Sequence, residues 1–349
     1  SGYKPVQLMK GSDDLPIIAV RTREGNPPIL SMKIVHCGNR LCNSGNQITT
    51  VATGDSISTF SIDAGSDGMP LIAYIEEASM SSQVASVHLI HCKDVACTSS
   101  DNTIILSVPV GQGAQPSYGV ALAGGETGKP YIAFGETYNY FYNDLYLGRC
   151  TDLLCSSFTT TLLESYPNYD VFADVNMILG SDGLPLISYY KFIDSTAAQH
   201  LRILHCRNTE CTQKSVTTIA QIPQNPTDPN SMMTGSNGLP WIFYYSYDSP
   251  FTGFMKLVKC LDNACGQFTT PQVVDSVGPN SFPPYPRQNT IAYNANGNPV
   301  MSYFDSNDIK NAIKIAMCRD PQCNDFNIVN MAAGPPLALA GGLSSLALI

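Results

Sequence analysis

The sequence predicts an all-β protein, a six-bladed β-propeller with four antiparallel strands in each blade. Two repeated markers predict this fold. All 12 cysteines fall in six Cys-x4-Cys pairs, and the first cysteines of successive pairs lie 54 to 58 residues apart. A turn that ends in proline recurs with the same period, at Pro16, Pro70, Pro130, Pro185, Pro240 and Pro299. Two markers in phase six times indicate six repeats, and four short strands in about 56 residues are typical of a propeller blade.

Each repeat is expected to hold four strands, which we call A to D. Strand A is rich in small residues, as in "STFSIDAG", and an Asp-Gly or Asn-Gly turn follows it. Strand B starts at the proline and continues through "LIAY", "YIAF" or "WIFYY". After a variable loop, strand C ("VHLIHC") enters the cysteine turn, and strand D ("NTIILSV") completes the repeat. Asp-Gly and Asn-Gly between apolar runs are strong hairpin signals.

The repeats divide almost the whole chain. We expect one propeller over residues 1–333, with blades at about 3–54, 55–111, 112–166, 167–222, 223–277 and 278–333, and an apolar tail at 334–349. A row of independent small β-domains is the rival arrangement. Units this short would bury too little apolar surface to be stable alone, which favours the propeller.

The repeat resembles that of secreted bacterial propeller proteins. The resemblance lies in a unit of Asp-Gly-x-Pro, an apolar strand ending in Ser-Tyr-Tyr, and a Cys-x-Asp/Asn-x-x-Cys turn, over residues 3 to about 333. It implies the architecture and a secreted protein. It implies little about activity, because most members of this family have no assigned role and a fold alone does not supply one.

The cysteine pairs are predicted to be disulfides. The second residue after each first cysteine is always Asp or Asn, which favours a turn between the cysteines. We therefore expect each pair to face one another across strands C and D, within disulfide range. The predicted disulfides are Cys37–Cys42, Cys92–Cys97, Cys150–Cys155, Cys206–Cys211, Cys260–Cys265 and Cys318–Cys323.

Zinc and redox chemistry are the alternatives for these pairs. His36, His91 and His205 each precede a first cysteine. However, adjacent strand residues point to opposite faces, and equivalent positions in neighbouring blades lie too far apart to share an ion. A redox pair would require one activated unit rather than six equivalent ones. No metal and no cofactor is predicted.

Basic residues recur at two positions of strand C. The position before the first cysteine holds His36, His91, Arg149, His205, Lys259 and Met317. Three residues earlier stand Lys33, His88, Tyr146, Arg202, Lys256 and Lys314. We interpret these as long side chains extending into solvent at the rim of the blades.

Ligand-binding residues are expected where the repeats differ, in the loops between strands B and C. Aromatic rings beside carboxylates suit sugars, and tyrosine is also enriched at protein interfaces. The candidates for a ligand or partner site are Tyr138, Tyr140, Phe141, Tyr142, Asp144, Tyr247, Asp248, Asp305 and Asp308. A structural role at the blade edge is the third possibility for these residues.

An enzyme and a calcium site are weaker alternatives. The sequence has no Gly-x-Ser-x-Gly and no His-Glu-x-x-His motif. Carboxylates that could converge for glycoside hydrolysis are Glu76, Glu77, Glu136, Asp194 and Asp305. The stretch "DSNDIKN" at 305–311 has part of a calcium-loop pattern but lacks its glycine and distal glutamate. No catalytic residue is therefore assigned.

Composition bounds the partners and the compartment. Charged residues make up 13% of the chain and the net charge is −9, which argues against nucleic acid or anionic lipid as partners. The absence of a run of about 20 apolar residues predicts no membrane span. Paired cysteines, together with an N-terminus without methionine, lead us to expect a mature secreted or cell-surface protein.

The tail does not fit the six-fold pattern. It is uncharged, and its "ALAGG" at 338–342 repeats the "ALAGG" at 121–125 in strand A of the third repeat, so it resembles the start of a seventh unit. Donation to a neighbouring molecule is one hypothesis, through an assembly strand containing Leu337, Leu339, Leu343, Leu346 and Leu348. The others are an intramolecular cap, the start of a further domain, and a membrane or sorting remnant.

These observations together favour a non-catalytic extracellular scaffold or interaction propeller. It would associate with itself, head to tail, or with another extracellular protein. A lectin-like glycan-binding propeller is the alternative, and an extracellular carbohydrate-active enzyme is the third hypothesis.

Overall fold

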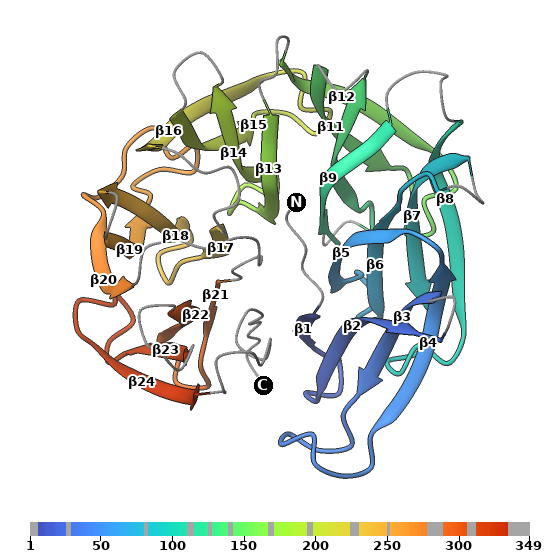
Figure 1. Ribbon diagram of the computed structural model, residues 1–349, viewed down its shortest axis with the longest axis horizontal. Coiled ribbons are helices and arrows are strands. Elements are labelled where there is room, and N and C mark those ends of the chain that lie inside the picture. The colour runs from blue at the N-terminus through green and yellow to red at the C-terminus, as the bar shows by residue number, and fades with distance from the viewer. Residues whose placement is uncertain are drawn as a thin grey trace.

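The computed structural model contains six four-stranded antiparallel sheets arranged around an axis, as Figure 1 shows. It describes residues 6–25, 29–79, 83–109, 115–124, 128–138, 142–166, 171–193, 198–223, 230–249, 252–277, 289–305 and 312–333. The predicted all-β, six-bladed propeller is confirmed. Within these residues, no helix is long and apolar enough to cross a membrane.

The strands follow the predicted A–B–C–D order in every blade. Blade 1 consists of β1 (Val6–Lys10), β2 (Pro16–Glu24), β3 (Ile29–His36) and β4 (Gln47–Gly54). Blade 2 consists of β5 (Ile57–Ala64), β6 (Pro70–Glu76), β7 (Val84–Cys92) and β8 (Ser100–Pro109). Blade 3 consists of β9 (Gln115–Ala123), β10 (Tyr131–Tyr138), β11 (Tyr142–Cys150) and β12 (Phe158–Tyr166).

The other three blades repeat this arrangement. Blade 4 consists of β13 (Val171–Leu179), β14 (Pro185–Ile193), β15 (Ala198–Cys206) and β16 (Lys214–Pro223). Blade 5 consists of β17 (Asn230–Thr234), β18 (Pro240–Ser249), β19 (Thr252–Lys259) and β20 (Gln272–Val277). Blade 6 consists of β21 (Thr290–Tyr293), β22 (Pro299–Asp305), β23 (Ala312–Cys318) and β24 (Phe326–Ala333).

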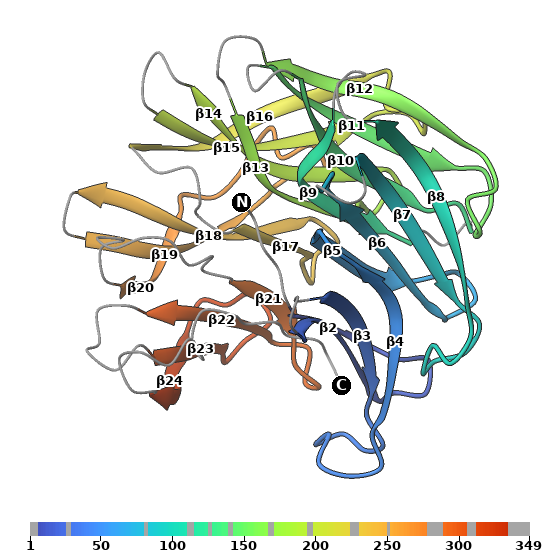
Figure 2. The same ribbon diagram turned by 45° about the vertical axis from the view of Figure 1, so that its right-hand side comes forward.

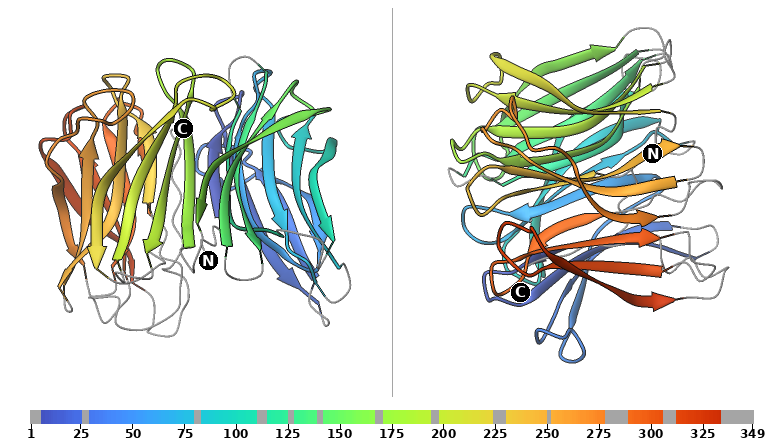
Figure 3. Two further views of the ribbon diagram at one scale, coloured as in Figure 1. Left: turned by 90° about the horizontal axis from the view of Figure 1, so that it is seen from above. Right: turned by 90° about the vertical axis from the view of Figure 1, so that its left-hand side faces the viewer.

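The strands run between two faces of the ring, as Figures 2 and 3 show. Because each blade is an up-and-down meander, the A–B turns and the cysteine loops lie on one face, which we call the turn face. The B–C hairpins and the D–A connections lie on the other, the loop face. Strand A of each blade is nearest the axis and strand D is outermost (Figure 1).

The core consists of five apolar layers, each between two successive blades. We call the side of a blade that faces the preceding blade its leading face, and the opposite side its trailing face. Between blades 1 and 2, for example, Ile17 and Ile34 on the trailing face pack with Ile72 and Tyr74 on the next leading face. Equivalent layers join blades 2 to 3, 3 to 4, 4 to 5 and 5 to 6.

A β-bulge recurs in strand D of every blade. The register between strands C and D shifts by one residue at the same repeat position in all six sheets. In blades 2 to 5 the extra residue is apolar and buried, as Ile105, Leu163, Ile219 and Val274 show. Because a bulge re-aims its strand, these residues fill the layer against the following blade.

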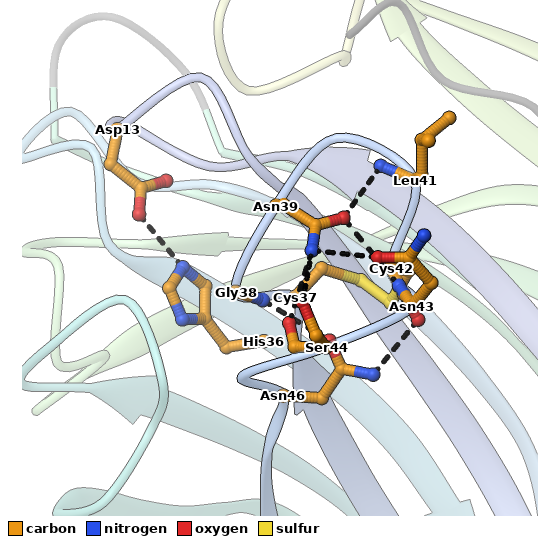
Figure 4. Close-up of a disulfide and its surroundings, with 10 residues drawn as sticks. All are labelled: Asp13, His36, Cys37, Gly38, Asn39, Leu41, Cys42, Asn43, Ser44 and Asn46. Carbon is orange, nitrogen blue, oxygen red and sulfur yellow. Dashed lines mark hydrogen bonds and ion pairs between the residues drawn. A yellow bond between two sulfur atoms is a disulfide. The ribbon is translucent and has the colours of Figure 1, made fainter.

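The six predicted disulfides are all present, with Cα–Cα distances of 4.7 to 4.8 Å. The predicted Asx turn is also confirmed: the Cys42 amide donates to the Asn39 carbonyl at 3.0 Å, and the Leu41 amide donates to Asn39 Oδ1 at 3.0 Å (Figure 4). Six disulfides with no free cysteine are typical of an oxidising, extracellular environment.

One detail of the predicted hairpin is wrong. Cys92 is opposite Ser100 in the strand pairing, not opposite Cys97. Cys97 instead lies inside the loop with a φ of 56°, and the second cysteine of every blade has the same left-handed backbone. The loop is therefore longer than four residues, and the disulfide joins the end of strand C to the loop itself.

Candidate functional site

The basic residues before the first cysteines were predicted to extend into solvent, and for the three histidines this is wrong. His36, His91 and His205 instead pair with Asp13, Asp67 and Asp182 of the A–B turns, at 2.8, 2.8 and 2.9 Å. Figure 4 shows the first of these pairs beside its disulfide. The three blades with histidine are those with aspartate three positions before the strand B proline. Because histidine and aspartate occur in the same three repeats, the sequence could have predicted these pairs.

The second basic position of strand C lies at the blade boundaries. Each of these residues is directly opposite the residue four positions after the strand B proline, for example Tyr74 opposite His88 and Tyr303 opposite Lys314. Two residues further along strand B, toward the loop face, come Glu76, Glu136 and Asp305 in blades 2, 3 and 6. Side chains two apart share a face of the strand, so these groups line the leading face together. We call this set the interblade site and number it by the two blades that meet there.

The 1/2 interblade site contains one carboxylate and one histidine. The His88 ring stacks on Tyr74 with 4.4 Å between centroids, and its Nε2 lies 3.9 Å from the Glu76 carboxylate. The His88 Nε2 is also 2.7 Å from the Ser86 hydroxyl. Burial raises the pKa of Glu76, with the nearby Asp55 adding to the effect, and burial lowers the pKa of His88.

The 3/4 and 5/6 sites contain ion pairs that join the two blades. Arg202 lies 3.3 Å from Glu164, which is in strand D of the preceding blade. Lys314 lies 2.8 Å from Asp275 of the preceding blade and 2.6 Å from Asp305 of its own. Burial alone would lower the pKa of Lys314, but the hydrogen bonds to both carboxylates and their negative charges together raise it.

The 2/3 site contains two carboxylates and no basic side chain among the described residues. Glu136 of β10 and Asp144 of β11 are directly opposite one another, so their side chains lie on the same face of the sheet. Where blades 3 and 5 place Glu164 and Asp275 in strand D, blade 2 places the apolar Leu106. The cationic residue of strand C is replaced by Tyr146.

Burial and charge repulsion act on Glu136 and on Tyr146 in this site. Burial, and then the nearby Asp144 carboxylate, raise the pKa of Glu136 to about 7. The Tyr146 hydroxyl lies 3.4 Å from Asp144 Oδ2, and burial together with both carboxylates raises its pKa to about 12. The other oxygen, Asp144 Oδ1, is buried without a hydrogen-bond partner in the described part of the molecule. The site therefore holds two half-buried carboxylates that no described cation neutralises.

The structure describes only part of the predicted ligand-binding set. Asp144 lies in the 2/3 site, whereas Asp305 is 3% exposed and contacts Lys314. Tyr138 and Tyr142 are backbone partners two positions beyond Glu136 and Asp144, toward the hairpin. Tyr247 and Asp248 lie in β18, and no side-chain position is described for these four residues. Tyr140, Phe141 and Asp308 are outside the described residues, as are the leucines of the tail.

No cluster of three or more His, Cys, Asp or Glu side chains arranged for a metal ion occurs within the described ranges. The calcium-like stretch at 305–311 is described only at its first residue. There the Lys314 ammonium contacts the Asp305 carboxylate.

Comparison with known proteins gives the fold but no family. No family model and no curated protein matches the sequence. A protein of unknown function from Dyadobacter fermentans DSM 18053 has a similar structure, with a TM-score of 0.52, 13% identity, and 81% of this chain and 85% of that chain covered.

Two carbohydrate-related structures are also similar. The SapL1 lectin, solved in complex with alpha methyl fucoside, has a TM-score of 0.52 and 10% identity, with 97% of this chain and 98% of the lectin covered. The polysaccharide lyase Uly1 has a TM-score of 0.51 and 9% identity, with 97% and 82% covered. At these identities the likeness shows the propeller fold alone.

Proposed function

We propose that this protein is a non-catalytic extracellular propeller that binds a glycan on its loop face, at the 2/3 interblade site. The observation that carries the proposal is the pair Glu136 and Asp144, half-buried and without a basic neighbour among the described residues. At the 3/4 and 5/6 boundaries, by contrast, the carboxylates of the preceding blade are paired with Arg202 and Lys314. Among the described residues, the 2/3 site thus has two adjacent carboxylates and no ion pair to the preceding blade.

The chemistry of the pair suits sugar hydroxyls. Carboxylate oxygens accept hydrogen bonds from neutral donors, and such charge-assisted bonds are stronger than neutral ones. Glu136 and Asp144 are only half-buried, and the Tyr146 ring stacks beside Phe134 with 5.9 Å between centroids. The same two strands carry Tyr138 and Tyr142 toward the loop face. A lectin that shares the fold over nearly its full length supports this choice of ligand class.

The proposal is tested by glycan-array screening and then calorimetry on the best ligand. We expect Asp144→Asn to weaken binding at least tenfold, because the amide replaces one acceptor oxygen with a donor. Asp101→Asn is the matched control, since Asp101 is an exposed carboxylate paired with Lys93 in blade 2. Equal binding by wild-type protein and Asp144→Asn would contradict the proposal.

A carbohydrate-active enzyme is the second candidate, favoured by the pKa of Glu136. A carboxyl that titrates near 7 beside a second carboxylate is what a general acid in glycoside cleavage requires. Polysaccharide digestion followed by product chromatography separates the two functions. Product release that Glu136→Gln abolishes while binding persists would establish the enzyme; binding without product release supports the lectin-like function.

The predicted scaffold role with head-to-tail assembly concerns residues 334–349, which are outside the described ranges. It remains a prediction, and the experiment in the next subsection distinguishes it from an intramolecular tail.

A further inference from the structure

Among the described residues, an apolar layer closes five of the six boundaries between blades but not the sixth. The sixth lies between blade 6 and blade 1, which are neighbours at the lower edge of the ring in Figure 1. Inner strands of all successive blades contact each other, from β1 with β5 to β17 with β21. Contact of that extent is not found between β21 and β1 in the described part of the chain.

The trailing face of blade 6 is apolar and only half-buried. Val300, Ile313 and Ile315 form its centre. The residues at the equivalent positions of blades 1 to 5 are between 0 and 4% exposed; in blade 2, for example, they are Leu71, Val87 and Leu89. The bulge residue shows the largest difference: Met331 is 60% exposed, whereas Ile105, Leu163, Ile219 and Val274 are between 3 and 6% exposed.

The leading face of blade 1 shows the same loss of cover. Ile18, Val20 and Val35 are half-buried, whereas their counterparts Ile72, Tyr74 and Ile90 of blade 2 are between 0 and 3% exposed. The cysteine loop of blade 1 is also less buried than those of the other blades. The disulfides of blades 2 to 6 each lie in an apolar layer with the preceding blade, whereas Cys37–Cys42 belongs to none of the five layers and Leu41 is 81% exposed.

The tail begins beside this boundary, because β24 of blade 6 ends at Ala333. After every earlier strand D, the chain enters the inner strand of the next blade, through connections such as residues 55–56 between β4 and β5 and 110–114 between β8 and β9. β24 ends at Ala333, and three residues then lead to Leu337. A connection of that length is in the same range, so the tail can reach the neighbouring inner position within its own molecule.

The tail sequence also matches an inner strand. Residues 338–342 repeat Ala121 to Gly125 of blade 3, where Ala121, Leu122 and Ala123 of β9 are between 2 and 4% exposed. The glycine that follows is required there, because a Cβ on Gly124 would lie 1.8 Å from the Ala64 carbonyl oxygen of β5. A segment with these small residues and no charge is suited to burial between two blades rather than to solvent.

We infer that residues 334–349 close the ring within one molecule, as the inner part of a seventh wedge between the trailing face of blade 6 and the leading face of blade 1. The tail buries the apolar groups of both faces, including Met331, Ile315 and Val20. It supplies along the axis the close contact that successive inner strands make at the other five boundaries. This inference is independent of the glycan-binding proposal.

Photo-crosslinking of the full chain tests the position of the tail. Benzoylphenylalanine replaces Leu339, and unlabelled protein is mixed with 15N-labelled protein before irradiation and mass spectrometry. We expect crosslinks within single chains to peptides of β1–β2 or β22–β23. Benzoylphenylalanine at Ile104, which is 58% exposed on β8, is the control and should reach neither pair. Crosslinks between labelled and unlabelled chains would show donation to a second copy and overturn the inference, as would tail crosslinks elsewhere.

Hydrogen exchange gives a second, independent measurement. Chains truncated after Ala333, and full chains carrying Leu339→Asp, should exchange amides of β1, β2 and β22 at least tenfold faster than wild type, while β10 and β14 remain unchanged. If the truncated chain does not fold, the point variant decides. Unchanged exchange at β1, β2 and β22 in a folded variant would overturn the inference.

Discussion

The 5/6 and 2/3 interblade sites are built from the same repeat positions but differ in charge balance. At 5/6, Lys314 lies between Asp275 and Asp305, and the Tyr303 hydroxyl donates to Asp275 at 2.8 Å. At 2/3, Glu136 and Asp144 face Tyr146 with no described cation. The same repeat position therefore serves different roles in different blades. Where the position holds a cation, as at 5/6, it forms ion pairs that join two blades. Where it does not, as at 2/3, the carboxylates remain available to a ligand.

The largest expected effect comes from removing the cation at 5/6. Lys314→Met leaves Asp275 and Asp305 together in a half-buried site, and breaking a buried ion pair on one side costs about 3 kcal/mol. The free energy of unfolding by guanidinium measures this. Lys33→Met is the matched control at the same position of blade 1, where the Glu24 partner is 60% exposed, and should cost less than about 1 kcal/mol. If both variants lose the same free energy of unfolding, the ion pairs of Lys314 contribute no more to stability than the exposed pair of Lys33.

An intermediate effect is expected from giving the 2/3 site the cation of its counterpart. Tyr146→Lys places an ammonium at the position of Lys314, beside Glu136 and Asp144. A cation within a few ångströms favours ionised carboxylates, so the pKa of Glu136 should fall from about 7 toward the ordinary range of glutamate. NMR titration of the Glu136 carboxyl carbon follows the change, and glycan binding should weaken as the carboxylates acquire an internal partner. If the pKa of Glu136 remains near 7 in this variant, burial rather than the lack of a cation is what raises it.

The smallest effect is the pH dependence of the 2/3 site. Glu136 is neutral in both folded and unfolded chains well below pH 4.5. As pH rises, the unfolded chain loses this proton first, so the native state is progressively destabilised up to about pH 7 and carries the whole penalty above it. Glu136→Gln should therefore stabilise the protein by about 1 kcal/mol at pH 8, allowing for partial exposure, and not at pH 4.

Thermal unfolding of Glu136→Gln and wild type at both pH values measures the difference. Glu24→Gln provides the opposite sign. The hydrogen bond from Lys33, and then its charge, lower the pKa of Glu24, so its ionised form stabilises the native state above the unfolded pKa and the glutamine variant loses that contribution. A stability difference for Glu136→Gln that does not change with pH would show that the raised pKa does not affect folding.

Repetition made the fold predictable from the sequence. The cysteine pairs and the proline turns repeat in phase, so the number of blades, the strand order and all six disulfides followed from them. The Asx residue in each loop also predicted its turn. The backbone of the second cysteine did not follow, because a left-handed φ at a non-glycine residue is set by the whole loop rather than by a local preference.

The interblade sites were less accessible to sequence reasoning. Glu136, Asp144 and Asp305 were all recognised as loop-end carboxylates, but the sequence does not show which of them face a lysine. That depends on the strand D bulge, which turns Glu164 and Asp275 toward the next blade, and on pairing between residues 28 and 39 positions apart at the 5/6 site. The tail, which repeats part of strand A, indicated from the sequence that the six repeats are followed by a further partial unit. The half-buried apolar faces of blades 1 and 6 could be seen only in the three-dimensional structure.

The short separation within each disulfide has a consequence for how the chain acquires its covalent structure. Each cysteine's partner is five residues away, and the nearest cysteine of another pair is about ten times as far along the chain. Closing a short loop is entropically easier than closing a long one, so a newly oxidised cysteine meets its native partner before any other. Correct pairing thus does not depend on the ring having formed. Each blade can be oxidised as it emerges, in sequence order, with little need for disulfide isomerisation.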